Sequence, residues 1–145
     1  MSRYSFGYLS SLLFHLYIYG CATALREVRL WVPEAVRSGH AVKLACDYDL
    51  EEAALYSIKW YRGDQEFYRY VPKESPPTRV FALPGIHVDI STSDAREVTL
   101  LDVQRQLTDF YKCEVSADAP LFHTEIKSAY MTVVGEYALP FDLLD

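Results

Sequence analysis

Apolar and polar residues alternate with a period of two along most of this sequence. Successive side chains of a β-strand point to opposite faces, so the alternation predicts strands that bury one face. No segment shows a sustained helical stripe, and neither an internal repeat nor a linker divides the chain. The clearest strand lies at residues 42–48, where the inward side carries Val42, Leu44, Cys46 and Tyr48. The pattern therefore predicts an all-β domain with a single core.

Further strands are expected where the same alternation recurs. Their ranges are 28–32, 56–62, 66–71, 86–90, 98–103, 110–117 and 125–134, with a short strand at 80–81. Pro33 cannot donate to a sheet ladder, so we expect the first strand to break there and to continue at 34–37. Alternation within 56–62 places Tyr56, Ile58 and Trp60 inward. Leu100 is expected to face the core as well, before a local irregularity at 101–102.

Four residues have the order and spacing of the central residues of an immunoglobulin domain, namely Cys46, Trp60, Tyr111 and Cys113. In such a domain the cysteines bridge strands B and F, the tryptophan of strand C packs on the bridge, and the tyrosine makes a corner contact. The separation of 67 residues between the cysteines leaves room for strands C′ and C″. The chain thus resembles an immunoglobulin-like V-set sandwich of two sheets. This predicts a Cys46–Cys113 disulfide and a core built on Trp60, Tyr111, Leu44 and Leu100.

The N-terminal residues 1–24 have the pattern of a secretory signal peptide. Arg3 supplies a positive charge, an apolar stretch follows, and Ala22-Thr23-Ala24 forms a small-x-small cleavage site. A transmembrane anchor or a buried N-terminal strand is the alternative, but the apolar run is shorter than the ~20 residues that span a bilayer. We therefore expect a signal peptide at 1–24, a V-type domain at 25–136 and a short tail at 137–145. Cleavage would also remove Cys21, and an oxidising compartment would favour the disulfide.

Composition and charge exclude several classes of function. A net charge of −6 and a pI of 5.2 disfavour nucleic-acid partners. The sequence has no asparagine and hence no N-glycosylation acceptor. After cleavage, three isolated histidines match no catalytic or metal-binding motif: His40, His87 and His123. We expect no enzyme activity, metal or cofactor; a small-molecule carrier would need a concave polar pocket, which the sequence does not indicate.

Charged and aromatic residues are predicted on the outer face of the sheet that contains strands C, C′, F and G. Tyrosine and arginine are enriched at protein interfaces because they combine apolar area with polar groups. Alternatively, these aromatic residues simply cover the sheet edge. We interpret the face as a partner-binding surface, and alternation selects Lys59, Tyr61, Tyr68, Tyr70, Lys112 and Glu114, with Phe110 as a further candidate.

The residues also resemble a known family, the beaten path proteins of insects, in its first immunoglobulin domain. The resemblance is carried by residues 25–28, 33–36, 46–50, 55–61, 66–70, 72–74, 80–81, 113–120 and 122–124. It implies a secreted neuronal recognition protein, or one held at the cell surface if the gene product is longer. It also implies heterophilic docking of the GFCC′ face, the outer face of strands G, F, C and C′, on immunoglobulin-superfamily partners of the sidestep family. Such binding would guide axons and control their separation from bundles.

The sequence departs from this pattern in two places. Many immunoglobulin domains carry Asp-x-Gly-x-Tyr-x-Cys at the corner before the second cysteine, whereas here Leu107 replaces the aspartate and Asp109 the glycine. The usual ion pair from that aspartate is therefore expected to be absent. Family members also continue into a second domain, so we expect either a short soluble form or a piece of a longer product. A secreted V-type domain in homophilic adhesion or immune recognition is the alternative function.

Overall fold

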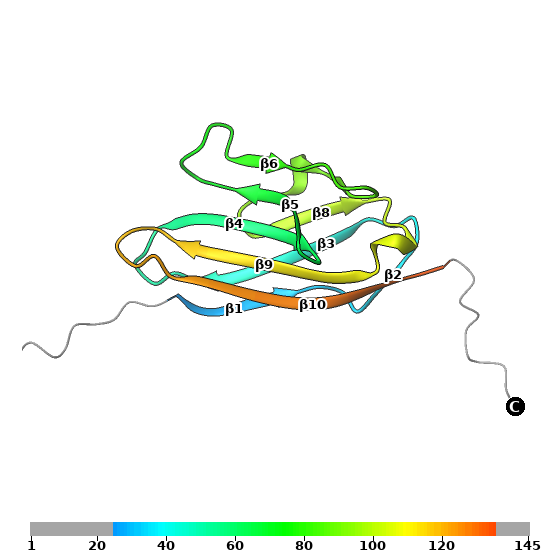
Figure 1. Ribbon diagram of the computed structural model, residues 1–145, viewed down its shortest axis with the longest axis horizontal. Helices are drawn as coiled ribbons and strands as arrows, with labels where there is room; N and C mark the ends of the chain where they lie inside the picture. Colours follow the sequence, from blue (N-terminus) through cyan, green and yellow to red (C-terminus); the bar gives the residue numbers. More distant parts are fainter. Residues whose placement is uncertain (1–24, 136–145) are drawn as a thin grey trace, which may run out of the picture.

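Two β-sheets pack face to face in the computed structural model, which describes residues 25–135 (Figure 1). The predicted signal peptide and tail lie outside the described residues. The four-stranded sheet has the order β1-β3-β8-β7. Its strands are β1 (Arg26–Trp31), β3 (Val42–Asp49), β8 (Glu97–Leu101) and β7 (His87–Val88). This sheet corresponds to strands A, B, E and D of the predicted sandwich.

The second sheet has six strands in the order β2-β10-β9-β4-β5-β6. Its strands are β2 (Ala35–Arg37), β10 (Thr124–Val134), β9 (Asp109–Ala117), β4 (Leu55–Arg62), β5 (Gln65–Tyr70) and β6 (Thr78–Val80). Strand β2 pairs in parallel with β10, and the other pairs are antiparallel. The chain therefore changes sheets between β1 and β2, at Pro33 as expected. Strands β5 and β6 are C′ and C″, which confirms the V-type arrangement.

The core between the sheets is built on the residues that the sequence predicts. A disulfide joins Cys46 of β3 to Cys113 of β9, with 6.4 Å between their Cα atoms. Four large side chains around this bridge have no exposed surface: Trp60, Tyr111, Leu44 and Leu100. The disulfide thus connects the two sheets through their most deeply buried layer, and the predicted core residues are confirmed.

Three details of the strands differ from the predictions. Tyr56 is not inward but 53% exposed, because a register shift between Leu55 and Ser57 turns it out of the alternation. Strand D is limited to His87–Val88, since the Asp89 carboxylate accepts the Ser91 N–H at 3.0 Å and starts a 3₁₀ turn. The C″ strand ends at Val80 and does not include Phe81.

The corner before strand β9 keeps its tyrosine despite the unusual residues around it. The short 3₁₀ helix η2 (Arg105–Leu107) precedes the strand, and the Tyr111 hydroxyl donates to the Leu107 carbonyl at 2.6 Å. That contact needs only the backbone of residue 107, so its side chain is free to be apolar. Leu107 itself is fully buried. The substitution of the usual aspartate therefore adds core area without removing the corner hydrogen bond.

Candidate partner-binding face

Strand β9 sets which side chains face solvent on the six-stranded sheet. Tyr111, Cys113 and Val115 are buried, so the intervening Lys112 and Glu114 point outward. The register with the neighbouring strands carries this pattern across the sheet. We call the resulting outer surface the GFCC′ face, and its side chains are Lys59, Tyr61, Glu66, Arg69, Phe110, Lys112, Glu114, Ile126 and Tyr130.

Glu114 is the centre of the polar network on this face. One carboxylate oxygen lies 3.7 Å from the Lys59 Nζ, and the other accepts the Tyr61 hydroxyl at 3.3 Å. Lys59 and Glu114 are directly opposite each other on β4 and β9, which places their side chains in reach. Partial burial, followed by the nearby Glu114 and Glu66 charges, raises the pKa of Tyr61 to about 12. Tyr61 is therefore a neutral hydrogen-bond donor at physiological pH.

Arg69 extends the network onto β5. Its guanidinium makes two bonds to the Glu66 carboxylate, at 2.7 and 2.9 Å, and hydrogen bonding to Glu66 is the main cause that raises the Arg69 pKa. The same guanidinium lies 5.2 Å from the centre of the Phe81 ring, and Arg79 lies 5.6 Å from that centre. The Arg69 side chain is restricted because it contacts both a carboxylate, through two bonds, and an aromatic ring. The β5–β6 edge thus presents its charges in a fixed arrangement.

Lys112 reaches from β9 towards the turn between β4 and β5. Its Nζ lies 2.9 Å from the Asp64 carboxylate, and this bond lowers the Asp64 pKa. Between these residues lies a depression of about 220 Å³ lined by Tyr61, Gly63, Asp64, Lys112, Glu114 and Ile126. It is smaller than the ~300–1,000 Å³ of pockets that bind small molecules.

The β9–β10 part of the face carries exposed apolar side chains. Phe110 and Tyr130 form an edge-to-face pair with ring centres 4.9 Å apart, and they remain 51% and 48% exposed. Ile126 is 54% exposed further along β10. The residue selection from sequence missed Ile126 and Tyr130, although alternation along 124–130 would have paired them with outward residues of β9. The face thus combines a charged centre with an apolar side.

The structure brings together four of the six residues selected from sequence. Lys59, Tyr61, Lys112 and Glu114 all lie on the GFCC′ face. The predicted outward orientation is wrong for Tyr68, which is fully buried opposite Trp60, and for Tyr70, which packs against the core opposite Ile58.

A β-bulge explains the change of orientation. Trp60 pairs with Tyr68 and the next residue, Tyr61, pairs with Glu66, so Phe67 is an extra residue on β5. A bulge lets two successive residues point the same way. Phe67 and Tyr68 are accordingly both buried. The outward positions on β5 are therefore taken by Glu66 and Arg69.

Within residues 25–135, no group of three or more histidine, cysteine, aspartate or glutamate side chains is arranged to bind a metal ion. Over the same residues, no helix has the length and apolar character needed to cross a membrane.

Comparison with known proteins identifies the fold. No protein-family model matches the sequence, and no curated protein matches it either. Among solved structures, murine CRIg is similar over 76% of this chain and 98% of its own, with 18% identity and a TM-score of 0.51. Domain 1 of VCBP3 from Branchiostoma floridae matches over 75% of this chain and 94% of its own, with 18% identity and a TM-score of 0.55.

Murine CEACAM1b gives a similar result, with 20% identity and a TM-score of 0.58 over 75% of this chain. The chain spans 54% of that longer structure. The V domain of amphioxus IgVJ-C2 also matches, with 14% identity and a TM-score of 0.54. Similarity at these identities establishes the fold alone: the chain forms a V-type immunoglobulin domain with a Cys46–Cys113 disulfide.

Proposed function

We propose that this V-type immunoglobulin domain is an extracellular recognition module whose GFCC′ face binds an immunoglobulin-superfamily partner of the sidestep kind. Its role is in axon guidance and in the separation of axons from bundles, and it catalyses no reaction. The resemblance of residues 66–70 and 113–120 to beaten path proteins supports the choice of partner. V-type immunoglobulin domains commonly bind proteins outside the cell, which supports the broader assignment.

One observation carries the choice of face: a charged centre lies beside an exposed apolar side on the same sheet surface. Glu114 holds Lys59 and Tyr61 in place, so these polar groups lose little conformational freedom when a partner docks. Ile126 and the Phe110–Tyr130 pair offer apolar surface for burial. Aromatic anchors inside a polar surround are typical of the residues that dominate binding energy.

The test is binding of the secreted chain to a panel of sidestep-like ectodomains. Tyr61→Glu and Ile126→Glu place a charge at the centre and at the apolar side of the face. We expect each to weaken binding by about 30-fold or more, as for truncation of a central interface residue. Lys43→Glu on the opposite sheet is the matched control, because Lys43 is about half exposed and lies outside the face. If all three variants are folded and bind with the affinity of the wild-type chain, the GFCC′ face is not the binding surface.

Self-association is the second candidate, because the same face carries charges of both signs beside its apolar side chains. A copy related by two-fold symmetry could match each charge with its opposite. Sedimentation of the chain over a range of concentrations separates the two candidates. A dimer that Ile126→Glu converts to a monomer would favour homophilic adhesion, whereas a monomer that binds the panel favours the heterophilic role.

A further inference from the structure

The loop between β9 and β10, which is the FG loop (residues 118–123), is fixed to two neighbouring loops. All three loops lie at the same end of the sandwich, on the left in Figure 1. The Asp118 N–H donates to the Ala54 carbonyl of the β3–β4 loop at 2.8 Å, and the Asp118 carboxylate pairs with Lys73 of the β5–β6 loop. The Ala117 N–H donates to the His123 carbonyl at 2.8 Å and closes the hairpin. The FG loop is therefore preorganised by contacts at its base.

Phe122 stands out within this loop because both its backbone and its side chain are in unfavourable states. Its φ is +49°, a left-handed conformation that is rare for bulky residues. Its side chain is 74% exposed, so it gains almost nothing from burial within the domain. Strained backbone and exposed aromatic surface are features that concentrate at functional sites.

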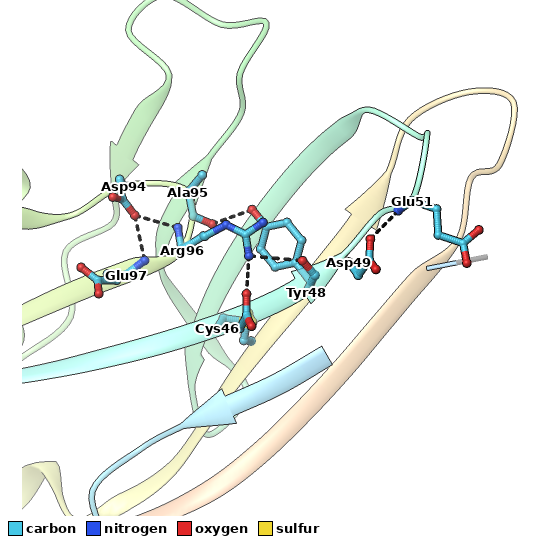
Figure 2. Close-up of polar contacts among 10 residues, drawn as sticks. Cys46, Tyr48, Asp49, Glu51, Asp94, Ala95, Arg96 and Glu97 are labelled. Atoms are coloured by element: carbon cyan, nitrogen blue, oxygen red, sulfur yellow. Dashed lines mark hydrogen bonds and ion pairs between the residues drawn. A yellow bond between two sulfur atoms is a disulfide. The ribbon is translucent and has the colours of Figure 1, made fainter. Parts of the chain in front are cut away.

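The β3–β4 loop next to the FG loop is acidic. Exposed carboxylates lie at the end of β3 (Asp49) and in the adjacent β3–β4 loop (Glu51 and Glu52), which Ala54 connects to the FG loop. Figure 2 shows how this loop is ordered: the Glu51 N–H donates to the Asp49 carboxylate at 2.8 Å. Behind it, Arg96 lies 4.2 Å from the centre of the Tyr48 ring and holds the end of β3 (Figure 2). This end of the domain therefore presents the exposed Phe122 ring next to a loop that carries exposed negative charges.

We propose that Phe122 is an anchor that inserts into an apolar pocket on the partner, and that basic side chains rim this pocket. The inference rests on the proposed function, because it names the chemistry of the surface that receives this domain. The contacts of Asp118 hold the loop before binding, so little ordering entropy is lost when the ring is buried. Aspartate and glutamate around the anchor favour a partner of opposite charge.

The experiment measures the affinity and association rate of the secreted chain for the ectodomain that binds most tightly in the panel. We expect Phe122→Ala to weaken binding by about 30-fold or more, as for other aromatic anchors. Glu52→Lys should slow association and reduce its dependence on salt, because it reverses one charge of the acidic surround. Binding that Ile126→Glu weakens and Phe122→Ala leaves unchanged would overturn the anchor while the proposed function stands.

A second measurement separates a binding role from a structural one. Phe122→Gly removes the exposed ring and puts glycine where φ is positive, which glycine adopts at no steric cost. We expect the melting temperature to stay the same or to rise. A clear fall in the melting temperature would mean that the Phe122 ring stabilises the domain. That result would contradict its role as a binding anchor. Failure of every ectodomain to bind the wild-type chain would overturn the proposed function and the anchor together.

Discussion

The Arg62 guanidinium of strand β4 lies 3.4 Å from the Asp109 carboxylate at the start of β9, and it also donates to the Gln106 carbonyl of η2. In many immunoglobulin domains an aspartate at the position of Leu107 pairs with an arginine near strand D. Here position 107 is buried and apolar, and the corner is supported by Arg62 on strand C, which is the neighbour of β9 in the six-stranded sheet. An ion pair therefore still stabilises this corner, but its arginine comes from strand C and not from near strand D.

Arg62→Ala should destabilise the domain because it leaves the Gln106 carbonyl and the Asp109 carboxylate without this cation. Hydrogen bonds to charged groups contribute ~1.5–3 kcal/mol, so we expect a loss of about 2 kcal/mol in the free energy of unfolding. Urea denaturation monitored by tryptophan fluorescence measures this change in the free energy of unfolding. Lys43→Ala breaks the more exposed Lys43–Glu97 pair and should cost at most about 1 kcal/mol. Equal losses would mean that Arg62 has no special role at the corner.

Tyr111→Phe isolates the corner hydrogen bond. The substitution removes one buried hydroxyl and leaves the Leu107 carbonyl without its 2.6 Å donor. An unsatisfied buried acceptor costs ~1–3 kcal/mol, and we expect the free energy of unfolding to fall by that amount. Tyr130→Phe is the matched control, because Tyr130 is 48% exposed and water can replace any lost contact. A Tyr111→Phe variant as stable as the control would contradict the importance of the corner.

Alkaline pH should destabilise the domain over a defined range. Burial raises the pKa of Tyr68 and Tyr111 to about 12, and burial with the Glu114 charge does the same for Tyr61. An unfolded tyrosine titrates near 10, so between about pH 10 and 12 the folded state holds protons that the unfolded state releases. Stability is therefore complete below about pH 10 and is lost as the pH rises towards 12.

Equilibrium unfolding at a series of pH values, together with tyrosinate absorbance of the folded chain, measures this effect. Tyr61→Phe should reduce the steepness of the alkaline loss, because it removes one of the three tyrosines whose pKa is raised to about 12. A folded chain in which every tyrosine ionises near pH 10 would contradict the prediction.

The core and the sheet topology could be predicted because they depend on side-chain alternation and on spacing. Cys46, Trp60 and Cys113 need only point inward from the two facing sheets, and a two-residue period shows this directly. The sheet change at Pro33 was predictable for a similar reason, since proline cannot continue a ladder.

The composition of the face was predicted only in part, because a bulge changes which residues face outward. No pattern in residues 65–70 shows that Phe67 is the extra residue, since all its neighbours tolerate a strand. The position depends on how β5 packs over Trp60 and Tyr111, with the Phe67 ring 6.3 Å from that of Tyr111. Long-range ion pairs such as Arg62–Asp109 are equally hidden, because the partners lie on strands distant in sequence.

The burial of Tyr68 gives a direct test of this bulge. Tyr68 has no exposed surface and its hydroxyl donates to the Asp94 carbonyl at 2.9 Å. Tyr68→Glu would bury a carboxylate and should cost more than about 4 kcal/mol, enough to unfold much of the domain. Tyr61→Glu, on the solvent-facing side of the bulge, should remain folded with a smaller loss of about 1–2 kcal/mol, because the new carboxylate lies near those of Glu66 and Glu114. Circular dichroism and urea denaturation of the two variants distinguish them; a stable Tyr68→Glu domain would mean that residue 68 faces solvent and that β5 continues without the bulge.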